Sequence, residues 1–300
     1  MKKPSRIQAL LLAILVTIIW STSWVLIKIG LEDVPALTFA GLRYMLASLI
    51  FFPLLLKKNI REQVRNLTLK DWLLLSVLGV ILYMIGQGGQ YLGLAYLPSV
   101  TVSLILNLSA LFVALVSWVT IGEKLNWLQW LGVLLNLGGV LVYFNPANQP
   151  AGSWLGWVFS ILCLLGNSIG SIIGRKVNRE AKIHPLVITG ISMTIGSIFM
   201  LATGILWQGL PALSARSIWI IIILAVVNTA LTFSLWNYTQ QTLLATESTI
   251  LNNTMLVYIA ILAWIFLGET QSTMGIFGLV LSLAGAMMVQ IRLKPRKSSD

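Results

Sequence analysis

Trp20, Trp24 and Lys28 recur at intervals of four residues in a strongly apolar segment. On a helix, this spacing places the three side chains in one stripe. Indole rings can hold an apolar or aromatic part of a solute, or a cation over the ring face. The stripe therefore predicts one wall of a solute pocket. Lys28 has two other possible roles, because it can extend to the lipid headgroups or pair with Glu32.

Charged side chains inside apolar segments are the next candidates, because each costs about 2.5–3.5 kcal/mol to insert into lipid. Besides Lys28, only Arg43 and Glu247 fall inside such segments. Arg43 can attract a carboxylate or phosphate of a solute, or it can donate hydrogen bonds that hold the fold together. Glu247 can relay a proton, or it can interact favourably with the amino-terminal dipole of its own helix.

Uncharged polar side chains form a larger set of candidates for a solute path at the middle of the membrane. An isolated amide in a membrane helix often joins two helices, but eight amides on five helices favour a path. The set consists of Ser21, Tyr83, Gln87, Gln90, Asn107, Asn167, Asn228, Asn237, Asn252 and Asn253.

The sequence lacks the residues that most enzyme chemistries require. The single Cys163 excludes an intrachain disulfide, and the single His184 excludes a multi-histidine metal site. The Gly86–Gln90 stretch superficially resembles a phosphate-binding loop, but no GK[ST] follows it, so no nucleotide site is expected. We expect no metal and no cofactor.

The composition shows what must position these side chains. Of 300 residues, 57% are hydrophobic and 10% are charged, and the mean hydropathy is +0.89. Lipid must therefore be the main solvent, and spanning segments must be helices that satisfy their own backbone groups. The sequence predicts an all-α integral membrane protein with ten transmembrane helices. They are 7–29, 35–56, 72–94, 99–121, 127–144, 153–174, 185–207, 217–238, 245–267 and 273–291.

The net charge of +11 first suggests a nucleic-acid partner, but its distribution indicates membrane orientation. With the amino terminus inside, 17 of the 20 basic residues fall in cytoplasmic segments. We therefore expect an inner (plasma) membrane protein with both termini in the cytoplasm. Membrane lipids and a small-molecule substrate are the expected partners, and nucleic acid is not. The oligomeric state stays open.

An internal repeat is visible when the chain is shifted by 146 residues. The shift superposes Gly122–Glu123 on Gly268–Glu269, each of which ends an apolar segment. We expect glycine to stop the helix there and the acid to cap the next helix, while a gating role is the alternative. Because each copy has five spans, the second copy must be inverted. The predicted organisation is a first five-helix repeat (7–144), a linker (145–152), a second repeat (153–291) and a basic cytoplasmic tail (292–300).

The two copies differ at the stripe described above. The shift replaces Trp20, Trp24 and Lys28 by Gly166, Gly170 and Gly174. Glycines at this spacing permit close helix packing, so the two halves cannot form a symmetric cavity.

Several motifs together carry a family resemblance. They are the Trp20–Trp24 segment WSTSW with Lys28, then Pro35 and Arg43, and the Trp-x-x-x-Gly-Glu endings. With them, the chain resembles the drug/metabolite transporter superfamily in its EamA-type branch of ten-helix exporters. The resemblance implies a substrate path between the two halves. Members often carry a proline in the fourth and ninth helices, which this chain lacks, so a hinge supplied by that proline is not expected here.

We therefore expect a secondary transporter that exports a small metabolite, an amino acid or related amphipathic solute, by alternating access at a central site between the repeats. A nucleotide-sugar or lipid-linked substrate carrier is the alternative within transport. Alternatives from other classes are a membrane-embedded lipid headgroup enzyme and an inert assembly or receptor subunit. Paired acids and catalytic triads that would support an enzyme are absent from the sequence.

Overall fold

The computed structural model describes residues 4–121, 126–144, 153–179, 182–243 and 245–290. Over these residues the chain is helical and has no strand, which confirms the predicted all-α class for the described part. The predicted linker 145–152, the tail 292–300 and Glu123 lie outside the described residues.

The helices follow one another with short connections, and η denotes a π-helical segment. The first half contains α1 (Arg6–Gly30), α2 (Ala36–Leu55), α3 (Lys58–Arg65), α4 (Leu69–Gly79), η1 (Val80–Gln87), α5 (Gly88–Tyr96), α6 (Ser99–Asn107), α7 (Ser109–Ile121) and α8 (Trp127–Tyr143). The second half contains α9 (Trp154–Arg179), α10 (Pro185–Gln208), α11 (Ala215–Ala225), η3 (Val226–Leu231), α12 (Thr232–Thr239), α13 (Ala245–Asn253), α14 (Met255–Leu267) and α15 (Thr273–Val289).

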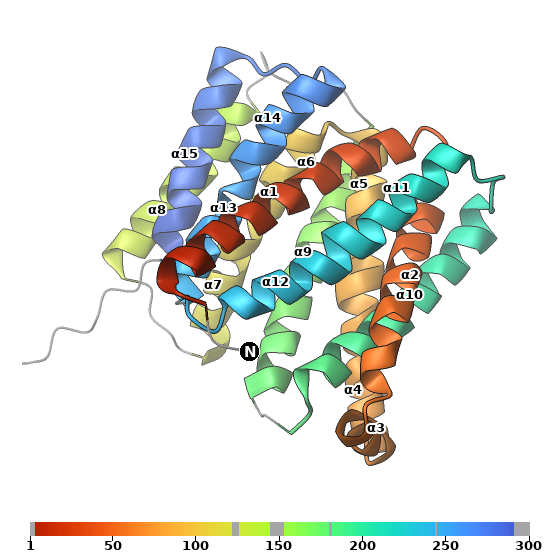
Figure 1. Ribbon diagram of the computed structural model, residues 1–300. Coiled ribbons are helices and arrows are strands. Elements are labelled where there is room, and N and C mark those ends of the chain that lie inside the picture. Colours follow the sequence, from red (N-terminus) through yellow and green to blue (C-terminus); the bar gives the residue numbers. More distant parts are fainter. Residues whose placement is uncertain (1–3, 122–125, 145–152, 180–181, 244, 291–300) are drawn as a thin grey trace, which may run out of the picture.

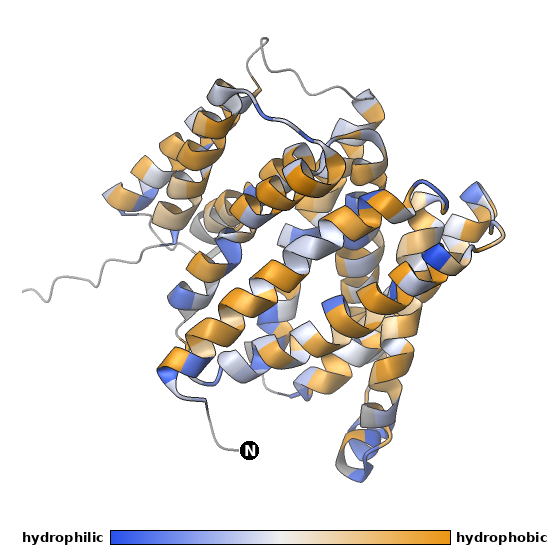
Figure 2. Ribbon diagram, turned by 45° about the horizontal axis from the view of Figure 1, so that its top comes forward, coloured by the Kyte–Doolittle hydropathy of each residue, from blue (hydrophilic) through white to orange (hydrophobic). Residues whose placement is uncertain are grey.

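Eight helical runs among the described residues are long and apolar enough to cross a membrane. The remaining two apolar helices, α8 and α15, have 17 residues each, or roughly 26 Å of helix. Figure 2 shows apolar residues over most of the helices and hydrophilic residues mainly toward their ends. Large apolar side chains such as Leu134, Leu141 and Phe277 are exposed on the outer surface, where lipid would cover them. The chain is a multi-pass membrane protein.

One helix was not expected from the sequence. α3 lies in the charged connection after α2, between the predicted spans 35–56 and 72–94. Ile60 is buried and Val64 packs beside it, against a cluster that includes Val187 of α10. The basic residues of α3 are exposed. The segment folds because its two apolar residues are four positions apart and share one helix face.

The interruptions of the helices repeat with the same 146-residue spacing as the sequence motifs. The π-helical segments η1 and η3 begin at Val80 and Val226. The fourth and ninth spans are interrupted at Leu108 and Thr254, whose N–H groups donate to carbonyl oxygens three residues earlier, both at 3.1 Å. Each hydrogen bond spans three residues in place of four, so both helical runs tighten into a 3₁₀ turn at these positions, without a proline.

Helices that correspond under this spacing pack against each other as antiparallel pairs. Figure 1 shows α8 beside α15 on one side of the molecule and α2 beside α10 on the other. In the α8–α15 pair, Gly132 lies against Val289 and Gly139 against Ser282, so residue numbers rise on one helix as they fall on the other. A Cβ atom at Gly132 would lie 2.7 Å from the Val289 nitrogen. Glycine therefore permits direct backbone contact between these two helices.

Candidate functional site

Arg43 lies at the contact between α2, α5 and η3 and is 5% exposed. Its Nε and Nη2 atoms donate to Thr229 Oγ1 at 3.3 and 3.2 Å, and Nη1 donates to the Tyr91 hydroxyl at 3.1 Å. Among the described residues, no carboxylate forms an ion pair with it. The hydrogen bonds to Thr229 join the first half to the second. Because these described acceptors are neutral hydroxyl groups, the guanidinium keeps a positive charge that can attract an anion.

A second chain of hydrogen bonds crosses the same contact between the halves. The Tyr44 hydroxyl donates to Gln87 Oε1 at 2.6 Å, and Gln87 Nε2 donates to Asn167 Oδ1 at 3.0 Å. Asn167 Nδ2 in turn donates to the Cys163 carbonyl oxygen at 2.9 Å. The Arg43 guanidinium lies 5.0 Å from the centre of the Tyr44 ring. The two hydrogen-bonded groups are therefore adjacent, and together they link α2, η1 and α5 of the first half to α9 and η3 of the second.

The π-helical segments determine where two of these side chains point. Thr229 is in η3, and its hydroxyl donates to the Leu224 carbonyl oxygen, five residues earlier, at 2.8 Å. Gln87 is the last residue of η1. A π-helical turn inserts an extra residue into the helix and rotates the side chains that follow, which is why such segments are frequent at functional sites.

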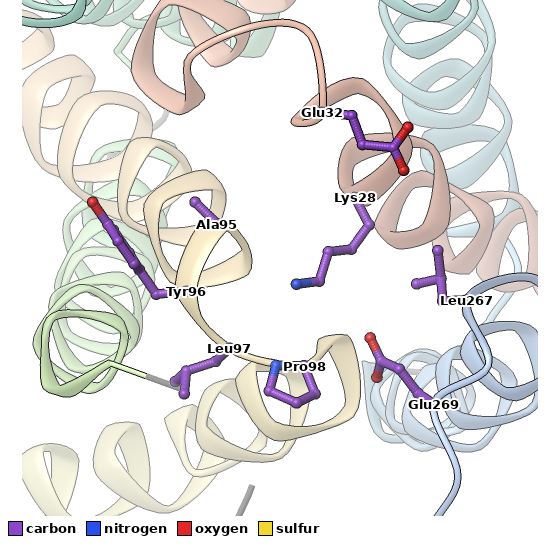
Figure 3. A pocket seen from close by; sticks show the side chains of 8 residues that line it. All are labelled: Lys28, Glu32, Ala95, Tyr96, Leu97, Pro98, Leu267 and Glu269. Atoms are coloured by element: carbon purple, nitrogen blue, oxygen red, sulfur yellow. The ribbon is translucent and has the colours of Figure 1, made fainter. Parts of the chain in front are cut away.

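A pocket of about 330 Å³ opens at one end of the molecule, between the ends of α1, α5 and α14. Figure 3 shows the Lys28 ammonium extending into the pocket and the Glu269 carboxylate facing the same space. Glu32, which also lines the pocket, pairs with Arg216 at 3.2 Å. Lys28 makes no ion pair with a described residue. The pocket thus presents the Lys28 ammonium and the carboxylates of Glu32 and Glu269, of which Glu32 is already paired, beside the apolar side chains of Ala95, Leu97, Pro98 and Leu267.

Glu269 also fixes the start of a helix in the other half. Its carboxylate oxygens accept hydrogen bonds from the Ser99 and Val100 N–H groups of α6, at 2.8 and 3.2 Å. The expectation that this acid caps the next helix is wrong, because Ser272 caps α15 by accepting from the Gly275 N–H at 3.0 Å. The acid instead caps α6, a neighbouring helix of the first half, and interacts favourably with the amino-terminal end of that helix's dipole.

The glycine before Glu269 behaves as expected. Gly268 ends α14 with φ +65°, in the left-handed region that favours glycine. The corresponding Gly122 and Glu123 lie outside the described residues.

The tryptophan stripe of α1 meets three different environments. Trp20 packs against Phe233 and Trp236 of α12, with ring centres 5.6 and 5.2 Å away. Trp24 is buried in the main core cluster, and only Lys28 lines the pocket. The structure therefore separates the three residues that the spacing places on one helix face.

The glycine face of α9 packs closely at two of its three positions. A Cβ atom at Gly166 would lie 2.5 Å from the Gly86 nitrogen, and one at Gly170 would lie 2.8 Å from Leu82 Cβ. At Gly174 the nearest atom is 3.9 Å away. Close packing is confirmed for the first two glycines, so the contact between α9 and η1 is much tighter than the aromatic contact between α1 and α12.

Three of the polar candidates act within or between neighbouring helices. Asn228 Nδ2 donates to the Ile19 carbonyl oxygen of α1 at 2.5 Å, which joins η3 to α1. The Ser21 hydroxyl donates to the Thr17 carbonyl oxygen of its own helix at 2.7 Å. The buried Tyr83 ring packs edge-on against Tyr44, with ring centres 5.6 Å apart. These contacts stabilise the helix interfaces around the site.

Five further candidates have no hydrogen bond to the Arg43 or Gln87 groups within the part of the chain that the structure describes. Gln90 is 8% exposed and has no hydrogen bond to a described residue. Asn107 Oδ1 and Asn253 Nδ2 are buried without a partner. These two residues correspond under the 146-residue spacing and lie just before the interruptions of their spans. Asn237 and Asn252 are exposed.

Glu247 lies in the first turn of α13. It pairs with Arg6 Nη2 at 2.6 Å, and its side chain is 23% exposed. The carboxylate is therefore paired with a cation and lies in the first turn of its helix, where the helix dipole favours an acid. Among the described residues, no group of three or more His, Cys, Asp and Glu side chains could hold a metal ion.

The sequence analysis missed three residues that hydrogen-bond with Arg43 or Gln87. They are Tyr44, Tyr91 and Thr229. Tyr44 directly follows Arg43, and Thr229 is the repeat equivalent of Tyr83, since 83 + 146 = 229. That correspondence could have indicated Thr229. No comparable signal exists for Tyr91, whose role depends on how α5 packs against α2.

Comparison with known proteins gives a consistent result. The chain matches the EamA-like transporter family over residues 7–145 and 154–291. It is 22% identical to the uncharacterized transporter YoaV of Bacillus subtilis over 299 residues, covering 97% of this chain and 99% of the relative. It is 27% identical to a probable amino-acid metabolite efflux pump of Escherichia coli over 235 residues, covering 75% of each chain.

Among solved structures, the chain resembles a crystal structure of a protein with a TM-score of 0.66 at 17% sequence identity. The match covers 95% of this chain and 96% of the other. At this identity the likeness shows the fold alone.

Proposed function

Because this chain belongs to the EamA-like transporter family, we propose that it is a secondary transporter that exports an amino acid or related amphipathic metabolite across the inner (plasma) membrane. The Escherichia coli relative is named for amino-acid metabolite efflux, which favours this substrate class. The family and its relatives are transporters and not enzymes, so the lipid headgroup enzyme is excluded.

The pocket at Lys28 is the observation that favours an amino acid as the solute. An amino-acid zwitterion carries its ammonium and its carboxylate on one carbon atom, and the pocket offers the Lys28 ammonium and the Glu269 carboxylate in the same space (Figure 3). The Leu97 and Leu267 side chains add an apolar wall. A volume of about 330 Å³ is at the small end of ligand pockets, which suits a small metabolite.

Alternating access is supported by the relation between the two halves. Equivalent helices pair antiparallel, the interruptions recur after 146 residues, and the family matches twice, once in each half. Two inverted five-helix repeats explain all three observations. The hydrogen bonds of Arg43 and Gln87 cross between these halves, so rocking of one half against the other would have to break or remake them.

The path is expected on one side of the molecule. The contact between α9 and η1 is made by backbone against backbone, whereas the corresponding contact between α1 and α12 is made by aromatic rings. Aromatic side chains can change rotamer and so open a space between their helices. Two helix backbones in direct contact can open a space only if the helices separate. We therefore expect solute to pass along the α1–α12 side, beside Trp20.

The ion pairs at the helix ends fit the proposed topology. Arg6 pairs with Glu247, and Arg216 pairs with Glu32. Each pair joins two segments that the ten-span topology places on the same side of the membrane.

A nucleotide-sugar carrier is less favoured than an amino-acid exporter. The pocket contains one cation and two acids, whereas a diphosphate would need more cations than acids around it.

Reconstituted vesicles test this function. Wild-type protein should move labelled amino acids faster than nucleobases or amphipathic cations, and no flux of any solute would contradict transport. Lys28→Met should lower amino-acid flux at least about tenfold, because a charge-assisted hydrogen bond is lost. Lys28→Arg should retain most of the flux. Lys70→Met, at an exposed lysine outside the pocket, is the matched control.

A further inference from the structure

A second pocket, of about 460 Å³, lies where the start of α3 meets the start of α10. It is lined by Lys57, Lys58, Ile60, His184 and Leu186. Three of these five side chains carry or can carry a positive charge, and no Asp or Glu of the described part of the chain lines the pocket. Neither the proposed transport path nor the Arg43 group uses these residues.

The geometry points to a binding site for the phosphate headgroup of an anionic membrane lipid. Two ammonium groups suit a phosphate, which accepts several charge-assisted hydrogen bonds. Ile60 and Leu186 line the same pocket and suit the glycerol and first acyl carbons that follow the headgroup. The mixed lining therefore favours a lipid over a free phosphate ion.

His184 is oriented to contribute a further donor. Its Nδ1 atom accepts a hydrogen bond from the Leu186 N–H at 3.2 Å, so in the neutral ring the hydrogen is on Nε2. A ring with Nδ1 as acceptor presents Nε2–H to whatever lies on its other side. The neighbouring backbone assists, because Lys57 precedes α3 without a side-chain cap and the first N–H groups of that helix can interact with an anion.

The pocket is held in place by contacts that do not use its charged groups. Gln63 of α3 donates from Nε2 to the Lys182 carbonyl oxygen at 3.1 Å, and its Oε1 accepts from the His184 N–H at 2.9 Å. Ile60 is 8% exposed and packs in the cluster between α3, α4 and α10. The lysines can therefore be replaced without removing the packing that forms the pocket.

The test uses the purified full chain in detergent with three probes: dioctanoyl-phosphatidylglycerol, dioctanoyl-phosphatidylcholine and inorganic phosphate. Native mass spectrometry would measure bound lipid, and thermal unfolding would measure stabilisation. Phosphatidylglycerol should bind at least about tenfold more tightly than phosphatidylcholine. The double variant Lys57→Gln/Lys58→Gln should lose that preference.

The matched control is Arg61→Gln/Arg65→Gln, which removes two charges from the same helix at exposed positions outside the pocket. It should keep the preference within about threefold. Equal losses in both double variants would mean diffuse charge attraction and would overturn the site. Retained preference in the lysine variant, or equal stabilisation by inorganic phosphate, would overturn it as well. Circular dichroism would verify that each variant is folded.

Discussion

Arg43 and Thr229 are 186 residues apart in the chain, yet two N–H groups of the arginine donate to one hydroxyl, at 3.3 and 3.2 Å. The contact joins α2 of the first half to η3 of the second. Because Thr229 passes its own hydrogen to the Leu224 carbonyl oxygen, its oxygen is free to accept. A buried guanidinium is thus held between the halves by hydroxyl groups.

Replacing Thr229 by Val should destabilise the protein by about 1–3 kcal/mol, because two N–H groups of a buried guanidinium lose their acceptor. Thermal unfolding in detergent measures the effect. Thr232→Val is the control, since Thr232 is equally buried and its hydroxyl donates to a backbone carbonyl oxygen three residues earlier, that of Thr229, at 3.4 Å. Equal shifts in the two variants would show that the Arg43 contact contributes nothing of its own.

Gln87 and Asn167 should be energetically coupled, because they hydrogen-bond across the two halves at 3.0 Å. A double-mutant cycle with Gln87→Ala and Asn167→Ala should give a coupling energy of about 0.5–3 kcal/mol. Unfolding free energies of the wild type, both single variants and the double variant provide the measurement. Additive effects would mean that the hydrogen bond is not maintained in the membrane.

Gly166→Ala should be much more harmful than Gly174→Ala, although both changes are on α9. The new methyl group would lie 2.5 Å from the Gly86 nitrogen in the first case, and 3.9 Å from the nearest atom in the second. We expect a loss of about 1–3 kcal/mol for Gly166→Ala and a much smaller change for Gly174→Ala. Yield of monodisperse protein and its unfolding temperature would measure both, and similar values would contradict the close contact of α9 with η1.

Glu269→Ala should weaken the start of α6 by about 0.5–2 kcal/mol, because the Ser99 and Val100 N–H groups lose their acceptors. Glu269→Gln keeps one acceptor oxygen and should lose less. Hydrogen exchange of the two amides gives a local measurement. Unchanged protection in the alanine variant would contradict the cap between the two halves.

Cysteine labelling should confirm the proposed orientation. The native Cys163 is fully buried and should not react, so the wild type serves as the background. A cysteine introduced at Arg61, on exposed α3, should react with an impermeant reagent only from the cytoplasmic side. Reaction from the outside would show that the orientation is the reverse of the proposed one.

Positions of the spans could be read from the sequence because lipid excludes charge, so each crossing leaves a long apolar run. The 146-residue repeat could also be read, and it coincides with the starts of η1 and η3 and with the interruptions at Leu108 and Thr254. α3 was missed because its amphipathic pattern is only eight residues long. A short segment rich in charged residues is predicted as a loop when only its composition is considered.

By itself, the sequence determined that this chain is a helical membrane protein, and it singled out Arg43, Lys28 and the polar residues inside the spans. It could not assign their partners. Tyr91 and Thr229 come to Arg43 from segments 48 and 186 residues away, and Asn167 comes to Gln87 from 80 residues away. Only the packing of helices brings such side chains within hydrogen-bonding distance, because a hydrogen bond requires atoms about 3 Å apart, which helix periodicity predicts only within one helix.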